Sequence, residues 1–522
     1  MSETKLRRFH SARWDEPLLV DLSVPGERGV LVPSAEPEVA AAVGELDGLL
    51  PPGLVRVALP TLPEIAQPQV VRHFSRLSQM TMGGDVTSDI GQGTCTTKYN
   101  PKVNERLAAL PQMTEMHPLQ DVTTAQGILE VLFRTREFMC EISGMDDVSF
   151  QPSHGGMAVM AVAAIVRVYH SARGEGEQRN EVITTINSHP CNPAAAASLG
   201  FKVITLMPNE LGYPDIEALK AVVSDRTAAL FITNPEDVGL YNPEIDEFTR
   251  LVHAAGGLCF TDQANLNGVI GRARAREAGF DMCQFNLHKT FSSPHGSFGP
   301  GCAALCVSEE LARYLPAPVV AFDGATYRLD FNRPESIGRV KDWLGNVMVV
   351  LRTYAYVMTL GAAGLREVAD TTVLNNNYLA TLLLQIPGIA YSYGNDDRRR
   401  LDQIRFTLEQ VMLDTGIGVE DMVDRITDFG LQEFWMSHHP LTVPEPCTPE
   451  PTETNSRQEL EEFALAMRQI VTEAYETPEI IKTAPHNGVV TSKVDAAWAG
   501  DPATACFTWR KWKRLCEQEV VC

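Results

Sequence analysis

Three polar residues each follow an apolar run that is typical of a strand, and together they could carry out cofactor chemistry. Lys289 follows one run, and a lysine held there can form an imine with an aldehyde cofactor. Asp262 ends another run, and a buried carboxylate facing a pyridine nitrogen keeps that nitrogen protonated. The imidazole of His189 could lie flat against the same ring. We therefore predict that these three residues form a catalytic set around a pyridine-aldehyde cofactor.

A phosphate group on such a cofactor needs its own site, and Ser153, His154, Gly155 and Gly156 provide a candidate. They precede the apolar stretch 157–169, which predicts a buried helix too short to span a bilayer. Small residues at a helix N-terminus leave backbone N–H groups and the positive end of the helix dipole open to an anion. Each piece alone is more often structural, but their order along the chain favours one cofactor site.

Short apolar runs alternate with helix-like segments between about 150 and 310, and this alternation must position the polar residues. Segments 215–223 and 244–256 are two of the helix-like pieces. The apolar runs are 181–187, 202–206, 228–234, 257–264, 282–289 and 302–308. The alternation is typical of a doubly wound α/β domain with a mostly parallel sheet, in which ligands bind beyond the carboxyl ends of the strands.

The rest of the chain divides by pattern into further regions. We expect an N-terminal arm over 1–68, a large cofactor-binding domain over 69–335, a connecting helix over 336–375 and a small C-terminal α/β domain over 376–522. Within these regions, 340–360 is a long helical stretch and 457–476 has helical periodicity.

The composition excludes several classes of partner. Acidic residues number 66 against 44 basic ones, and the resulting net charge of −22 repels nucleic acid and anionic membranes. The 11 cysteines are scattered without a CxxC pair, so we predict no metal site. The charged N-terminus is followed by no apolar run of the secretory type. We therefore expect a reduced, cytoplasmic protein.

Specific motifs resemble the glycine decarboxylase (glycine cleavage system) P-protein family, in particular its subunit that carries pyridoxal 5'-phosphate (PLP). The resemblance runs from about residue 60 to near the C-terminus. The shared stretches are KYNP (98–101), TAQGILE (124–130), ISGMD (142–146), AALFITNP (228–235), DxANLN (262–267), GFD (279–281), NLHKTF (286–291), PHG (294–296), RPESIGRVK (333–341) and EPTET (450–454). The resemblance implies a fold type I (aspartate-aminotransferase-like) PLP-dependent enzyme that works as a homodimer.

The resemblance also assigns roles to residues. The three residues of the catalytic set match the family's Schiff-base lysine, its partner of the pyridine nitrogen and its ring-stacking histidine. Asn265 stands where related enzymes place a group on the ring hydroxyl. Asn286 and His288 stand where those relatives bind the phosphate.

The chain departs from the family at residues expected to face the substrate. The family's PHGGGGPG is PHGSFGPG here, which replaces two glycines by Ser297 and Phe298. The family's TNPNTLG is TNPEDVG here, which introduces Glu236 and Asp237 at a strand end. These changes leave the residues that hold the cofactor mostly intact, as expected when the substrate of an enzyme has been exchanged.

Two enzymatic functions follow from these observations. The first, which we favour, forms a quinonoid from another amino acid, for example a cationic one such as S-adenosylmethionine, because Glu236 adds negative charge. It would use this species for replacement or C–C bond formation with a second small-molecule substrate in specialised metabolism. The alternative is glycine decarboxylation with aminomethyl transfer to a lipoyl-carrier protein. The presence of Lys289, Asp262 and His189 argues against a non-catalytic relative.

Overall fold

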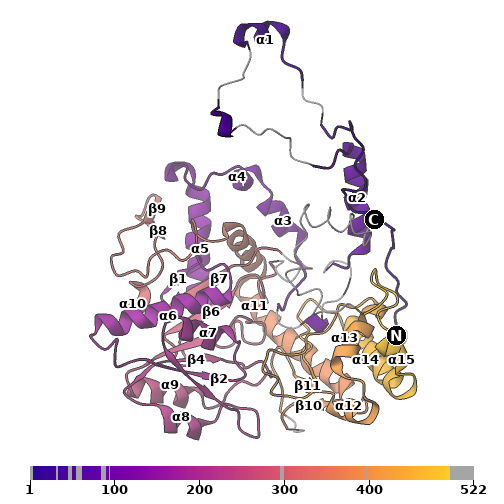
Figure 1. Cartoon of the computed structure of the whole chain (residues 1–522). Coiled ribbons are helices and arrows are strands. Elements are labelled where there is room, and N and C mark those ends of the chain that lie inside the picture. The colour runs from indigo at the N-terminus through magenta and orange to yellow at the C-terminus, as the bar shows by residue number, and fades with distance from the viewer. Residues whose placement is uncertain are drawn as a thin grey trace. The chain divides into compact units, whose positions relative to one another are not determined.

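The structure is a computed structural model, drawn in Figure 1. It describes residues 4–30, 33–44, 50–54, 62–83, 87, 90–92, 95–293, 299–394 and 398–493. Contacts divide the chain into two compact units. The larger consists of Met1–Phe9, Gly83–His486 and Val490–Cys522, and the smaller of His10–Met82 with Asn487–Val489.

A seven-stranded sheet forms the centre of the larger unit (Figure 1). Its order is β1-β7-β6-β5-β4-β2-β3, and all neighbours are parallel except that β7 runs antiparallel to both β6 and β1. The strands are β1 (Asp147–Ser149), β2 (Glu181–Thr185), β3 (Lys202–Leu206), β4 (Thr227–Thr233), β5 (Leu258–Asp262), β6 (Met282–Asn286) and β7 (Ala303–Val307). The expected mostly parallel α/β fold is confirmed.

Helices cover both faces of this sheet, which explains why its strands are apolar almost throughout. On one face lie α6 (Gly155–Ala172) and α7 (Cys191–Ser198), whose apolar side chains share a core cluster with Val182, Phe231 and Phe260. The other face is covered by α5 (Gln126–Ser143), α8 (Ile216–Val222) and α9 (Ile245–Ala254). The strand ends therefore project beyond both helical layers.

The long helix α11 (Val347–Leu383) differs from the helical stretch predicted over 340–360. It begins later because Trp343 and Gly345 have positive φ angles of 58° and 80°. A Cβ atom on Gly345 would lie 2.1 Å from the carbonyl oxygen of Phe150. The chain therefore packs its backbone closely there, just before the predicted phosphate-binding residues 153–156. At Gly361 the backbone is not helical, with φ 61° and ψ −176°, so α11 consists of two helical segments joined by a kink.

The C-terminal part of the larger unit has its own small sheet and apolar core. Its antiparallel strands are β10 (Ala390–Tyr391), β11 (Phe406–Thr407) and β12 (Pro446–Cys447). Its helices are α12 (Glu409–Thr415), α13 (Val419–Ile426), α14 (Arg457–Glu476) and α15 (Glu479–Lys482). The helix predicted over 457–476 is confirmed as α14, which starts with a capping box between Ser456 and Glu459.

Shorter elements complete the larger unit. They are α3 (Lys102–Ala108), α4 (Pro111–Thr114), α10 (Glu309–Ala312) and the hairpin of β8 (Val319–Phe322) with β9 (Tyr327–Asp330). By length and composition, α6 and α11 could cross a membrane. Core helices have the same character, and α6 packs on β4 to β7.

The smaller unit contains α1 (Pro37–Val43) and α2 (Gln67–Met80). On α2, the Nδ1 atom of His73 lies 2.8 Å from a carboxylate oxygen of Glu16, and Arg76 donates to the other oxygen at 3.0 Å. The domain boundaries expected at 68, 335 and 375 stay predictions.

Candidate active site

A cavity with about 500 Å³ of empty volume lies where β4, β5 and β6 end. Its lining consists of His189, Thr233, Pro235, Glu236, Asp237, Asp262, Gln263, Ala264, Asn265, Lys289, Asp402, Gln403 and His438. The structure thus brings the three residues of the predicted catalytic set into one cavity, at the edge of the sheet where the strand pattern places them.

Lys289 lies in the turn that follows β6, and its residue is only 8% exposed. Its backbone N–H donates to the carbonyl of Asn286 at 3.0 Å. The hydroxyl of the next residue, Thr290, donates to Asn267 at 2.6 Å and accepts from the backbone N–H of Leu266 at 2.8 Å. These contacts fix the backbone of the turn from which the Lys289 side chain reaches the cavity.

Asp262 is the last residue of β5 and is 2% exposed. Its Oδ1 accepts hydrogen bonds from the side-chain amide of Gln284 and, at 3.2 Å, from the backbone N–H of Ala264. The Sγ of Cys191 lies 3.9 Å from its Oδ2. One carboxylate oxygen is therefore anchored by the protein, while the other has only a weak thiol donor.

His189 follows β2, and its Nδ1 accepts the backbone N–H of Cys191 at 3.0 Å. Its ring meets that of His438 edge to face, with centroids 4.4 Å apart. Burial lowers the pKa of His189. Burial, reinforced by the nearby positive charges of Arg405 and Lys289, lowers the pKa of His438 to about 4. Both imidazoles are therefore neutral near pH 7, which suits stacking and hydrogen bonding rather than charge pairing.

The start of α6 packs too closely on its surroundings to accept larger side chains. A Cβ on Gly155 would lie 3.0 Å from Nε2 of Gln284 and 3.1 Å from the amide of Asn286. A Cβ on Gly301 would lie 2.7 Å from the carbonyl of Ser153. The side-chain oxygen of Asn286 is buried without a hydrogen-bond partner in the described structure. These features form a polar cradle at the N-terminus of a helix of 18 residues.

Three side chains predicted near the phosphate already have partners within the protein. His154 caps α6 by accepting the backbone N–H of Met157 at 3.2 Å, and the Ser153 hydroxyl lies 3.7 Å from the sulfur of Met157. His288 accepts the backbone N–H of Cys302 at 3.0 Å. Their contact with a phosphate stays a prediction, and backbone N–H groups at the start of α6 are the freer donors.

Asn265 is held by residues from two distant parts of the chain. Its amide donates to Oε1 of Glu450, and the hydroxyl of Thr96 donates to its side-chain oxygen. Burial raises the pKa of Glu450 well above its ordinary value. Glu450 is the first residue of the EPTET stretch. Its hydrogen bond with Asn265 therefore brings that stretch into contact with the DxANLN stretch.

Glu236 and Asp237 line the cavity, as the sequence suggested, but they do not present bare negative charge. Asn187 donates to Glu236 at 3.3 Å, and burial raises the pKa of Glu236 to about 7. The carboxylate of Asp237 lies 3.8 Å from Arg405 and 3.9 Å from His438. The expectation that these residues require a cationic substrate therefore loses its physical basis. Ser297 and Phe298 lie outside the described residues.

The C-terminal part of the chain contributes residues that sequence reasoning missed. Asp402, Gln403 and His438 line the cavity, and Arg405 reaches its edge through Asp237. Arg405 is 3% exposed, and its Nη2 has no hydrogen-bond partner among the described residues. No motif marks these residues. An arginine within an otherwise apolar strand-like run, IRF, was the available signal for Arg405.

Comparison with known proteins supports the resemblance. Residues 368–491 match the family described as glycine dehydrogenase, C-terminal domain, and residues 158–412 match aminotransferase class-V. Over 515 residues the chain is 41% identical to the probable glycine dehydrogenase (decarboxylating) subunit 2 of Pyrococcus abyssi, covering 98% of this chain and 99% of that protein. The protein of the same name from Aeropyrum pernix is 38% identical over 511 residues, covering 96% and 97%. The chain belongs to this glycine dehydrogenase subunit 2 family.

Solved structures agree on the fold of this glycine dehydrogenase family member. The crystal structure of glycine decarboxylase (P-protein) of the glycine cleavage system, in inhibitor-bound form, gives a TM-score of 0.69 at 19% identity, over 84% of this chain and 100% of that one. A cysteine desulfurase from Escherichia coli gives 0.58 at 16% identity, over 78% and 99%. The resemblance and the fold class predicted from sequence are confirmed, and the protein is a PLP-dependent enzyme of the glycine decarboxylase family.

The residues present fit PLP. Lys289 offers an amine and Asp262 a carboxylate within one cavity, and the cradle at α6 suits a phosphate. The unpartnered side-chain oxygen of Asn286 is consistent with this, because turning the amide over would direct its N–H groups to an anion. Which residues contact the cofactor stays a prediction.

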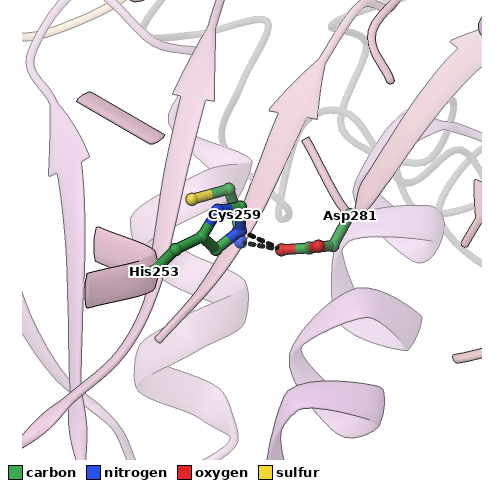
Figure 2. A group of neighbouring side chains, drawn as sticks. All are labelled: His253, Cys259 and Asp281. Atoms are coloured by element: carbon green, nitrogen blue, oxygen red, sulfur yellow. Dashed lines mark hydrogen bonds and ion pairs between the residues drawn. The ribbon is translucent and has the colours of Figure 1, made fainter. Parts of the chain in front are cut away.

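A separate cluster in this glycine dehydrogenase family member lies at the opposite edge of the sheet. Figure 2 shows His253, Cys259 and Asp281, whose potential metal-ligand atoms all lie within 4.8 Å of one another. Asp281 accepts from His253 and from the backbone N–H of Cys259, both at 2.8 Å. The Cys259 thiol donates to the carbonyl of Thr249 at 3.7 Å. Since each of the three side chains has a hydrogen-bond partner within the protein, we interpret the cluster as a set of structural contacts that join α9 to the sheet.

Proposed function

We propose that this enzyme decarboxylates glycine with bound PLP and passes the remaining aminomethyl group to a lipoyl-carrier protein. The observation that carries the proposal is the meeting of Lys289, Asp262 and His189 in one cavity, in a chain 41% identical to a relative named for glycine decarboxylation. Bound PLP supplies an electron-withdrawing ring that stabilises the negative charge left on the α-carbon when CO2 departs.

Each of the three residues has a role in this proposal that follows from its surroundings. The buried amine of Lys289 would hold the cofactor covalently. Asp262, whose Oδ2 has only the Cys191 thiol 3.9 Å away among the described residues, would keep the ring nitrogen protonated. The neutral imidazole of His189, which His438 contacts edge to face, would stack on the ring.

Arg405 is the residue we assign to the α-carboxylate of the substrate. Its guanidinium is buried, and its Nη2 has no hydrogen-bond partner among the described residues. Asp237 lies 3.8 Å away, beyond hydrogen-bond distance. Guanidinium groups bind carboxylates through two parallel hydrogen bonds, which would orient the carboxylate that is to be lost.

The other function, in which an amino acid other than glycine is the substrate, has less support. It depends on full negative charge at Glu236 and Asp237. With a pKa of about 7, Glu236 is only about half ionised at pH 7, and Asp237 has Arg405 and His438 beside it. A cationic amino acid is therefore treated as an outcome of the test below and not as the expected substrate.

The test is exchange of the glycine α-carboxyl group with isotopically labelled bicarbonate. We expect exchange by the PLP-loaded wild-type enzyme, faster when a lipoyl-carrier protein is added, and a loss of at least about 10³-fold in Lys289→Ala. Borohydride reduction should attach the cofactor to Lys289 in the wild type. Turnover of a cationic amino acid such as S-adenosylmethionine without glycine exchange would contradict the proposal.

A further inference from the structure

Gln284 is a fully buried polar residue on the apolar side of the sheet. It is the middle residue of β6 and has 0% exposure. Because side chains alternate along a strand, it points to the same face as Met282, which packs in the apolar cluster beneath α6. Burying an amide in such surroundings is costly unless it makes hydrogen bonds that matter.

The amide of Gln284 lies between two parts of the proposed cofactor site. It is the register partner of Asp262 on the neighbouring strand, and its Nε2 donates to Oδ1 of that carboxylate. On its other side it contacts Gly155, where a Cβ would lie 3.0 Å from Nε2. Its orientation is fixed, because an amide oxygen against the carboxylate would be repelled.

The other donors to Asp262 do not replace this contact. The backbone N–H of Ala264 reaches the same oxygen at 3.2 Å, and the Cys191 thiol is a weak donor 3.9 Å from Oδ2. Gln284 is therefore the one side-chain amide that donates to this carboxylate in the described structure. Its hydrogen bond engages Oδ1, whereas Oδ2 has the Cys191 thiol 3.9 Å away.

We propose that Gln284 is a positioning residue for Asp262. Its hydrogen bond fixes the rotamer of the carboxylate, so that Oδ2 could hold the proton on the pyridine nitrogen of bound PLP. The unsubstituted Gly155 gives the amide room to do so. This inference rests on the proposed PLP site at Lys289 and Asp262, and it does not depend on glycine being the substrate.

The main test is Gln284→Met, which keeps the length of the side chain but removes the donor. We expect weaker PLP binding by about 10-fold or more, and kcat lower by about 10- to 100-fold with little change in KM. The absorbance transition that follows protonation of the bound cofactor's ring nitrogen should move to lower pH. That shift is a readout which a merely structural role would not produce.

A second variant, Gln284→Glu, decides the question even if the first does not fold. A protonated glutamic acid can still donate to Asp262, whereas an ionised one repels it. Bound-cofactor absorbance should therefore resemble the wild type at low pH and be lost as the pH rises, while the wild type keeps its cofactor. A pH dependence equal to that of the wild type would overturn the proposal.

The matched control is Gln126→Met on α5. The amide of Gln126 donates to the carbonyls of Val122 and Tyr327 at 2.8 Å, away from the cavity. This variant should lower thermal stability without changing the cofactor spectrum. If Gln284→Met behaves in the same way, with kcat within about twofold of the wild type, Gln284 has no positioning role. A wild-type protein that never acquires PLP absorbance would refute the cofactor site itself.

Discussion

At the scale of single residues, burial decides the chemistry of the acidic groups in this cavity. Glu236 is 2% exposed, and removal from water raises its pKa from 4.5 to about 7. The pKa of Asp402 rises to about 6 for the same reason. Although the chain has a net charge of −22, carboxyl groups in its active site are thus partly protonated near neutral pH. Counting acidic residues in the sequence overstates the negative charge that a substrate meets.

Glu236→Gln should remove a pH dependence of stability. Because the folded pKa of Glu236 lies above the unfolded one, its contribution is fully present below pH 4.5 and is lost as the pH rises through about 7. Between about pH 5 and pH 8 the free energy of unfolding of the wild type should therefore fall by a few kcal/mol more than that of the variant, at about 1.4 kcal/mol per pKa unit.

Urea unfolding of the PLP-loaded protein at both pH values measures this difference. The control is Glu217→Gln, which changes an exposed glutamate on α8 paired with Lys220. The control should follow the wild type across the pH range. A constant offset between Glu236→Gln and the wild type would show that Glu236 is ionised in the folded state.

At the scale of elements, turns between strands and helices carry the site. The start of α11 is one of these turns, since Gly345 packs its backbone against Phe150, directly before the loop that leads into α6. The positive φ of Gly345 and the contact distance both require a residue without a side chain. A helix far along the sequence is thereby connected to the proposed phosphate cradle.

Gly345→Ala should be strongly destabilising. Its Cβ would lie 2.1 Å from the Phe150 carbonyl at a φ of 80°, so the loop must move. We expect a loss of at least about 3 kcal/mol in the free energy of unfolding, together with weaker PLP binding. Gly338→Ala is the matched control, because Gly338 has a φ of 88° but nothing within 4 Å of the added atom. It should cost only about 1–2 kcal/mol. Equal losses in the two variants would contradict the importance of this close approach.

At the scale of the whole molecule, two apolar cores meet around one cavity. One lies on the large sheet and the other under α14, and the cavity takes Lys289 from the first region and His438 from the second. A shift of one region against the other would change the cavity directly. Large apolar side chains also remain exposed on the larger unit, among them Phe322, Phe331 and Trp343, which are 42%, 62% and 40% exposed.

We predict that the protein forms a homodimer, because exposed aromatic side chains of this kind commonly mark interfaces. Sedimentation equilibrium should give twice the chain mass of 57.4 kDa at micromolar concentration. Phe331→Arg should weaken the association, whereas Leu413→Arg, at a site 72% exposed on α12, should leave it unchanged. A mass of one chain at every concentration would contradict the prediction.

Local pattern was enough to predict the sheet and the residues that follow its strands. The runs at 257–264 and 282–289 contain β5 and β6, and Asp262 and Lys289 at their ends line one cavity, because the carboxyl ends of parallel strands share one edge. The start of α11 was predicted wrongly, because the apolar periodicity continues through residues that Gly345 holds in a turn.

The amino-acid sequence by itself determined the family and the fold, since these depend on short motifs and strand periodicity, and it singled out Lys289, Asp262 and His189 as the predicted cofactor residues. Only the tertiary structure decided that His438 lines the cavity, that Arg405 lies beside Asp237 and that Gln284 donates to Asp262. It also decided that the pKa of Glu236 rises to about 7, so that this carboxyl is only partly ionised at pH 7. These properties arise from burial and from contacts between segments far apart in the chain, which no local pattern encodes.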